Sequence, residues 1–168
     1  MILLKLSLSS IFQRRLRARV TVLVGAGSLM ATVAVAGSAT EPVNFLSSLT
    51  DKPLKFQHRT DQILTEAVKS FHLTGKNPYS GNEAVIAKGK KIYNQLCQAC
   101  HLPDGTGRIG PNLTDETWNR KRTNTEVGRF EMIYGGGAGA MQAFGDRIDQ
   151  DDILKVMAFI DTLRKPAK

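Results

Sequence analysis

The sequence predicts an all-α protein. Apolar residues recur at the three- and four-residue spacing of helices in four separate stretches. Segments rich in glycine and proline, which favour turns and loops, separate these stretches. No stretch alternates between apolar and polar residues as a half-buried strand would, and no internal repeat is present. Because 168 residues is the size of one domain, we expect a single helical domain behind a short leader.

The first 36 residues have the three parts of a secretory signal peptide. Segment 1–20 holds five Lys and Arg and no acid, segment 21–36 is apolar, and Ala34 and Ala36 form an A-x-A cleavage site. We expect cleavage after Ala36 or Ala39 and a mature protein in the periplasm. The alternative is an uncleaved anchor helix, since the apolar run is close to membrane-spanning length.

Removal of this leader changes the charge of the protein. The whole chain has a formal net charge of +8, but without 1–36 it keeps 18 basic and 15 acidic side chains. This near balance gives no reason to expect nucleic acid binding. We expect a monomer with no stable membrane insertion once the leader is removed.

The mature chain divides into three parts. Residues 37–59 hold two prolines and show no clear period, which predicts an N-terminal arm that lies over the domain with partial disorder. The domain itself is expected over 60–165, and a short tail over 166–168 ends the chain.

Two helices are expected before the first functional motif. The first should begin behind the cap candidates Thr60 and Asp61 and end before Gly75. It is an extra helix that precedes the core of the domain. The second should run from about Ala84 to Leu96, with its apolar residues near one face.

Two further helices are expected after a long loop. Thr123 and Glu126 have the spacing of a capping box at the start of the third helix, which the three glycines 135–137 end. The last helix should begin at Asp149 or Gln150, where acidic residues in the first turn suit the helix dipole.

Both cysteines of the chain lie in "LCQACH", and His101 directly follows Cys100. A disulfide with Cys97 is compatible with export, but C-x-x-C bridges usually serve redox catalysis on α/β frames, which this sequence lacks. A zinc site needs about four ligands, and no second pair of thiols is present. The arrangement C-x-x-C-H is typical of covalent haem attachment, which we favour.

The spacing has a mechanical reason. Two thiols on adjacent helix turns can bond the two vinyl groups on one edge of a porphyrin, and the next residue can then direct its imidazole at the iron. We therefore predict one covalently bound haem c, held by Cys97 and Cys100, with His101 as the proximal iron ligand.

The second axial position decides the chemistry, because His or Met closes the iron for electron transfer while an open position binds gases or peroxide. His58 and His72 lie in the arm and the first helix, where surface or core roles are the default. Met132 and Met157 lie in amphipathic stretches, where a core role is the default. Met141 lies in the glycine-rich loop "GGGAGAMQAFG", which could bring a thioether to the iron, so we predict it as the sixth ligand.

The segments "GKKIYNQLCQACH", "GPNL", "MQAFG" and "ILKVMAFIDTL" resemble the class I cytochromes c. The resemblance implies a fold in which the N- and C-terminal helices cross. Gly89 and Tyr93 match one side of this crossing, and Phe159 and Ile160 match the other.

The same resemblance implies further haem contacts. The carbonyl of Pro111 would accept a hydrogen bond from Nδ1 of His101, which fixes the ring tautomer. Leu113 and Trp118 would lie against the haem.

A narrower resemblance covers about residues 54–163. The segments "FHLTGKNPY", "GRIGPNLTDETW" and "TNTEVGRFEMIYGGGAGAM" are similar to cytochrome c(L). That family accepts electrons from periplasmic pyrroloquinoline-quinone (PQQ) dependent methanol dehydrogenases, calcium- or lanthanide-dependent, and some members bind calcium near the haem propionates.

The resemblance implies an electron-transfer protein and not an enzyme. It would accept single electrons from a PQQ-dependent alcohol dehydrogenase, above all a methanol dehydrogenase, and pass them to another c-type cytochrome or a terminal oxidase. One alternative is a cytochrome c that serves a different dehydrogenase or oxidase. The other is a haem sensor or peroxidase-like protein with an open sixth position.

Basic residues are candidates for steering a partner. Arg120, Lys121 and Arg122 form a basic run, and Arg108 lies in the loop after the haem motif. Charges around a docking face speed association with a partner of opposite sign.

Overall fold

The computed structural model describes residues 41–57 and 62–164. Some of the expectations above therefore lie outside the described residues, namely the signal peptide 1–36 with its cleavage sites, the arm residues 37–40, His58, the cap candidates Thr60 and Asp61, and the tail 166–168.

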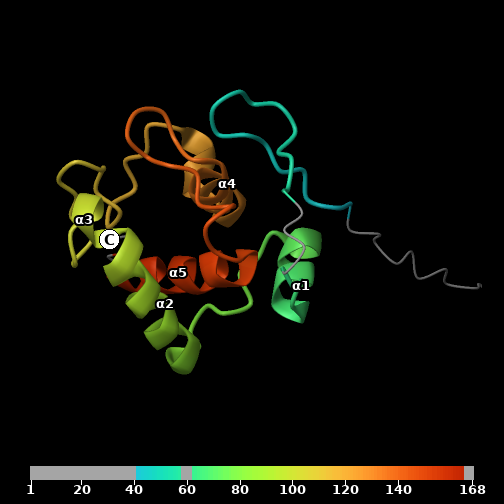
Figure 1. Cartoon of the computed structure of the whole chain (residues 1–168), viewed down its shortest axis with the longest axis horizontal. Helices are drawn as coiled ribbons and strands as arrows, with labels where there is room; N and C mark the ends of the chain where they lie inside the picture. Colours follow the sequence, from blue (N-terminus) through green and yellow to red (C-terminus); the bar gives the residue numbers. More distant parts are fainter. Residues whose placement is uncertain (1–40, 58–61, 165–168) are drawn as a thin grey trace, which may run out of the picture. The chain divides into compact units, whose positions relative to one another are not determined.

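The described part of the chain is helical, as the sequence predicts (Figure 1). Its elements are α1 (Glu66–Thr74), α2 (Glu83–Leu96), α3 (Gln98–His101), the 3₁₀ helix η1 (Lys121–Asn124), α4 (Glu126–Gly135) and α5 (Gln150–Leu163). Over these residues the extended pairing is limited to one isolated bridge in the arm, between Leu46 and Pro53. None of the described helices is long and apolar enough to cross a membrane.

Helices α2 and α5 cross, as Figure 1 shows. Gly89 lies at the crossing, where a Cβ atom would overlap with the backbone carbonyl of Lys155. One turn later the ring of Tyr93 packs edge-on against Phe159, with centroids 5.1 Å apart. A glycine is therefore required for the two backbones to approach, and the crossing implied by the resemblance is present.

Helix α1 begins later than the sequence predicts. Its cap is Thr65, whose Oγ1 accepts a backbone N–H of the first turn at 3.3 Å and donates to Asp151 of α5 at 2.6 Å. Ile63 and Leu64 precede the helix and are 80% and 42% exposed. The predicted start behind Thr60 and Asp61 is therefore too early, because the contact of Thr65 with α5 places the start of the helix at Glu66.

Helix α4 is capped by Thr125 and not by Thr123. The Thr125 Oγ1 accepts a hydrogen bond from the N–H of Gly128 at 3.0 Å. The η1 turn places Thr123 before the helix, and the Glu126 carboxylate accepts the backbone N–H of Asn77. The predicted capping box is therefore wrong, because a long-range contact occupies its glutamate.

The described arm residues pack on the helices. Phe45 is 7% exposed and lies 5.8 Å from Phe71 and 5.6 Å from Phe130, measured between ring centroids. His72 of α1 lies between Phe45 and Phe56, at 5.0 and 4.9 Å. The arm thus completes the aromatic core that α1 and α4 share.

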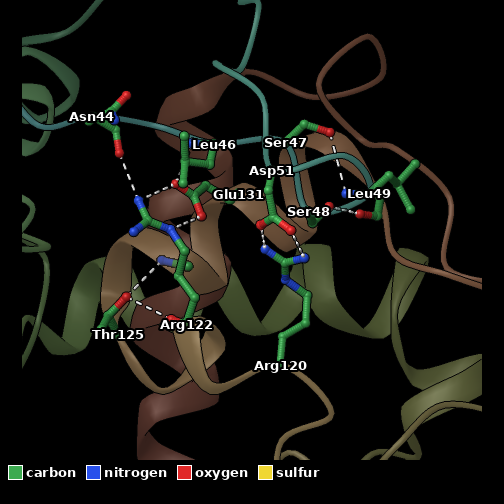
Figure 2. A network of polar contacts seen from close by, with 12 residues as sticks. Asn44, Leu46, Ser47, Ser48, Leu49, Asp51, Arg120, Arg122, Thr125 and Glu131 are labelled. Carbon is green, nitrogen blue, oxygen red and sulfur yellow. Dashed lines mark hydrogen bonds and ion pairs between the residues drawn. The ribbon is translucent and has the colours of Figure 1, made fainter.

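Two residues of the basic run attach this arm (Figure 2). Arg122 forms a two-point ion pair with the buried Glu131 of α4, at 2.6 and 2.7 Å, and donates to the carbonyl of Asn44 in the arm at 2.7 Å. Arg120 pairs with Asp51 of the arm. Lys121 is exposed and has no ion-pair partner in the described ranges. Of the three steering candidates in the basic run, Arg120 and Arg122 are therefore engaged in ion pairs within the molecule.

Candidate functional site

A cavity of about 280 Å³ lies between α3, the loop 109–120, α4, the glycine-rich loop and α5. Its lining includes every residue that the sequence and the resemblance assigned to a haem site. These residues are Cys97, Cys100, His101, Pro111, Leu113, Trp118 and Met141.

Helix α3 brings the motif residues to this cavity. Cys97 lies at the junction of α2 and α3, and its carbonyl accepts the N–H groups of Cys100 and His101 at 3.1 and 3.0 Å. This tight turn keeps all three side chains in the cavity lining. Both thiols are free and partly buried, so a disulfide is not formed.

The imidazole of His101 is held in one orientation. The side chain is 7% exposed, and its Nδ1 lies 2.9 Å from the carbonyl oxygen of Pro111. Because a carbonyl can only accept, Nδ1 carries the hydrogen and Nε2 keeps a free lone pair for a metal. A Cβ atom on Gly110 would lie 2.5 Å from Cε1 of the ring, so the glycine makes room for the imidazole.

Tyr93 connects this histidine to the helix crossing. Its hydroxyl donates to the carbonyl of Leu102 at 2.7 Å, directly after His101. Burial raises the pKa of Tyr93 to about 12, so the hydroxyl remains a neutral donor at physiological pH. Leu102 has a positive φ of 62°, an uncommon conformation that this hydrogen bond helps to hold.

The surroundings of Cys97 disfavour the thiolate, which is the form that binds metals. Burial, with a smaller contribution from Cys100, raises the pKa of Cys97 to about 11, which keeps the thiol protonated. In the described residues no three His, Cys, Asp or Glu side chains lie together in a way that could hold a metal ion. Neither the zinc alternative nor the calcium expectation gains support from this part of the chain.

Three methionines line the cavity, and not only the predicted one. The backbone carbonyl of Met141 accepts the N–H of Gly137 at 3.0 Å, which closes the loop that carries it. Met157 belongs to the core of α5 and is 1% exposed. Met132 of α4 is only partly buried and faces the same cavity, although the sequence suggested a core role alone. The sequence offered no signal for this, because the place of Met132 in the lining depends on how α4 packs against α5.

Part of the cavity lining is polar. Arg120, Arg129, Trp118 and Ser48 contribute to its lining. The Nε1 of Trp118 and the Nε of Arg129 are buried without a hydrogen-bond partner among the described residues. Buried N–H groups of native proteins are normally paired, so both indicate an acceptor that the chain itself does not supply.

Arg129 also has partners away from the cavity. Its guanidinium contacts Asp161 of α5 at 3.3 Å and donates to the carbonyl of Asn124 at 3.1 Å. Burial lowers the pKa of Arg129 and raises that of Asp161, and each charge partly offsets this effect on the other. Two contacts outside the cavity therefore hold the guanidinium, and its buried Nε–H is left for a ligand.

These features fit a haem c. The lining combines two thiols, an imidazole, thioethers and apolar side chains, and two of its buried N–H groups are unpaired, as suits a cofactor that carries carboxylates.

Comparisons with known proteins point to the same cofactor class. The family model described as cytochrome c oxidase, cbb3-type, subunit III matches residues 84–160. Cytochrome c-L of Methylorubrum extorquens is 33% identical over 96 residues, which cover 57% of this chain and 49% of that protein. The cbb3-type cytochrome c oxidase subunit FixP of Bradyrhizobium diazoefficiens is 35% identical over 106 residues, 61% of this chain and 35% of that protein.

A solved structure covers more of the chain. The crystal structure of cytochrome cL from Hyphomicrobium denitrificans superposes with a TM-score of 0.70 at 34% identity, over 74% of this chain and 76% of that one. The chain spans about half of the Methylorubrum protein and about a third of FixP.

Proposed function

Since this chain belongs to the class I c-type cytochromes and is a homologue of cytochrome c-L, we propose that it accepts electrons from a PQQ-dependent alcohol dehydrogenase. The family consists of electron-transfer proteins and not of enzymes. Methanol dehydrogenase is the proposed donor, and another c-type cytochrome or a terminal oxidase is the proposed acceptor. We place this exchange in the periplasm, after export by the segment 1–36.

The observation that carries the proposal is the convergence of the motif residues on one cavity. Covalent haem c is the cofactor of the family, and we infer that Cys97 and Cys100 bond it while His101 and Met141 ligate the iron. When bound, haem c supplies an iron that changes its oxidation state by one electron.

The chain's own residues prepare the site for this change. The Pro111 carbonyl and Gly110 hold the His101 ring in one tautomer and position, so that no reorientation accompanies the change in charge. Trp118 and Arg129 offer N–H donors for the haem carboxylates. Leu113 and Ile160 of α5 contribute apolar side chains to the cavity lining.

The rim of the cavity offers a surface for a transient partner. Ile109 lines the cavity and is 65% exposed, and Ala138 and Ala140 of the glycine-rich loop lie exposed in the same lining. Redox encounters bury little surface because the complex must dissociate after every transfer. Arg108 and Lys121 are the exposed charges that remain available near this rim for steering.

A second candidate function follows from the other matches. The family model over 84–160 and the similarity to FixP favour a carrier that serves an oxidase. In that case the protein would deliver electrons efficiently to an oxidase but would not accept them from alcohol dehydrogenases.

Stopped-flow reduction separates the two candidates. The ferric protein is mixed with a PQQ-dependent methanol dehydrogenase and its substrate, and we expect substrate-dependent reduction with a saturable rate. Reduction that is no faster than without substrate, together with rapid oxidation of the ferrous protein by a cbb3-type oxidase, would favour the second candidate.

A matched pair of variants tests the proposed docking rim. Ile109→Ser should slow the second-order reduction several-fold and leave the haem spectrum unchanged. Leu73→Ser changes a residue of α1 that is 57% exposed and does not line the cavity, and it should react like the parent. Equal rates for both variants would place the docking face elsewhere.

A further inference from the structure

Among the described residues, two arginines line the cavity, Arg120 and Arg129. Each forms an ion pair with an aspartate, but the two aspartates come from different parts of the molecule. Arg129 is paired with Asp161 of α5, inside the folded core. Arg120 is paired with Asp51 of the N-terminal arm, through one contact of 3.4 Å and a second, shorter one (Figure 2). The charge that the arm brings to the cavity wall is therefore that of Asp51.

The arm presents Asp51 on a closed turn. The N–H of Ser47 donates to the carbonyl of Lys52 at 2.7 Å, and the N–H of Asp51 donates to the carbonyl of Ser47 at 2.9 Å. Asp51 itself has a φ of 56°, a left-handed conformation that aspartate tolerates better than most residues. The carboxylate is thus placed by backbone geometry and not by a flexible side chain alone.

The same turn covers part of the cavity. Ser48 is 6% exposed, belongs to the cavity lining and donates its hydroxyl to the carbonyl of Gly136 in the glycine-rich loop. Just before the turn, the N–H of Leu46 donates to Glu131, which Arg122 holds in place (Figure 2). The turn is therefore fixed at both sides, next to the loop that carries Met141.

The ion pair is charged at neutral pH. The hydrogen bond and the charge of Arg120 hold the pKa of Asp51 below its usual value, with a smaller effect from Arg122. The Arg120 side chain is 28% exposed and that of Asp51 is 67% exposed, so the arginine is the inner partner and the aspartate the outer one.

We propose that Asp51 is a positioning residue that compensates the charge of Arg120 at the cavity and thereby lowers the reduction potential of the bound haem. This inference rests on the proposed function, since it requires haem c in the cavity. The oxidised site carries one more positive charge than the reduced site, so a cation nearby favours reduction. Without Asp51, the full charge of Arg120 would act on the site.

The test is the midpoint potential of the purified holoprotein, measured by spectroelectrochemistry without any partner. Asp51→Asn should shift the one-electron equilibrium constant threefold to tenfold toward the reduced protein. This shift corresponds to a rise in the midpoint potential of roughly 30 to 60 mV. Arg120→Gln should lower it. In the Arg120→Gln background, Asp51→Asn should have little further effect, because the exposed carboxylate is then screened by water.

Control variants separate charge from structure. Glu66→Gln removes a carboxylate from an exposed ion pair on α1 that does not line the cavity, and Lys121→Gln removes the neighbouring cation. Both should keep the parent potential. Asp51→Glu retains the negative charge, so its midpoint potential should lie close to that of the parent.

The sign of the shift decides the outcome. If Asp51 only fastens the arm, its loss would admit water to the cavity, which favours the more charged oxidised state and lowers the potential. An unchanged or lowered potential in Asp51→Asn, with the parent's haem spectrum, overturns the inference and leaves the proposed function intact. A parent protein without a haem c spectrum would overturn the proposed function itself.

Discussion

The residues around His101 determine what its imidazole can do. The Pro111 carbonyl fixes the tautomer, and Gly110 provides the space that the ring occupies. Tyr93 fastens the next residue, Leu102, through a hydrogen bond of 2.7 Å. A ligand held on three sides can bind iron strongly because little conformational freedom is lost on binding.

Gly110→Ala tests this arrangement. The new Cβ atom would lie 2.5 Å from the His101 ring, so the ring must move and its bond to Pro111 must weaken. We expect destabilisation by roughly 1–3 kcal/mol in thermal unfolding and an altered ferric spectrum. Gly135→Ala is the control, since its Cβ atom would meet its neighbours at 3.5 Å or more. A Gly110→Ala protein with the parent's spectrum and stability would show that the ring is not confined.

At the scale of helices, the fold depends on the crossing of α2 and α5. Gly89→Ala would force a methyl group into the backbone of α5 at Lys155, where no side chain can move aside. We expect a loss of about 2–3 kcal/mol in chemical denaturation, near the upper end for overpacked sites. Lys90→Ala on the exposed face of the same helix should change stability by less than about 0.5 kcal/mol. Similar stabilities for the two variants would contradict the close crossing.

The contact between the arm and α1 predicts a dependence on pH. The Nε2–H of His72 donates to Oε1 of Gln150 at 2.7 Å, and the ring lies between Phe45 and Phe56, where burial lowers its pKa. The unfolded chain, with a histidine pKa of about 6.5, then binds a proton at higher pH than the folded protein does. Folding stability should therefore fall as the pH drops from about 7 through 6.5 toward the lower folded pKa.

His72→Phe keeps an aromatic ring in this position but cannot titrate. Denaturation at several pH values between 5 and 7 should show a shallower loss of stability in this variant than in the parent. The comparison concerns the slope and not the absolute stability, because Gln150 loses its partner in the variant. Parallel slopes would mean that His72 does not contribute to the pH dependence.

At the scale of the whole molecule, local signals predicted most of the helices. The crossing helices were placed within a residue or two because their apolar faces and caps lie within the segments themselves. The cap of α1 was missed because Thr65 is selected by its contact with Asp151, 86 residues away. The ion pairs of Arg120 and Arg122 were not predicted either, since Asp51 is brought to Arg120 by the folded arm and Glu131 is brought to Arg122 by the packing of η1 on α4.

The cavity shows the same division between local and long-range information. The motif Cys97–His101 was identified from spacing alone, because one helical turn fixes its geometry. Met132 and Arg129 were not identified as lining residues, since their place in the cavity lining depends on how α4 packs against α5. Sequence periodicity tells which residues are buried but not which of them face a cofactor.

The ligand set of the iron is the central claim. The most direct measurement is the sulfur-to-iron charge-transfer band near the red end of the ferric spectrum, recorded for Met141→Leu and for Met132→Leu. We expect Met141→Leu to lose the band, lower the reduction potential and bind carbon monoxide in the ferrous form, because the sixth position opens. Met132→Leu, which changes the other partly buried thioether of the cavity, should keep the band. A band that survives in Met141→Leu, or one that is lost only in Met132→Leu, would contradict the proposed coordination of the haem.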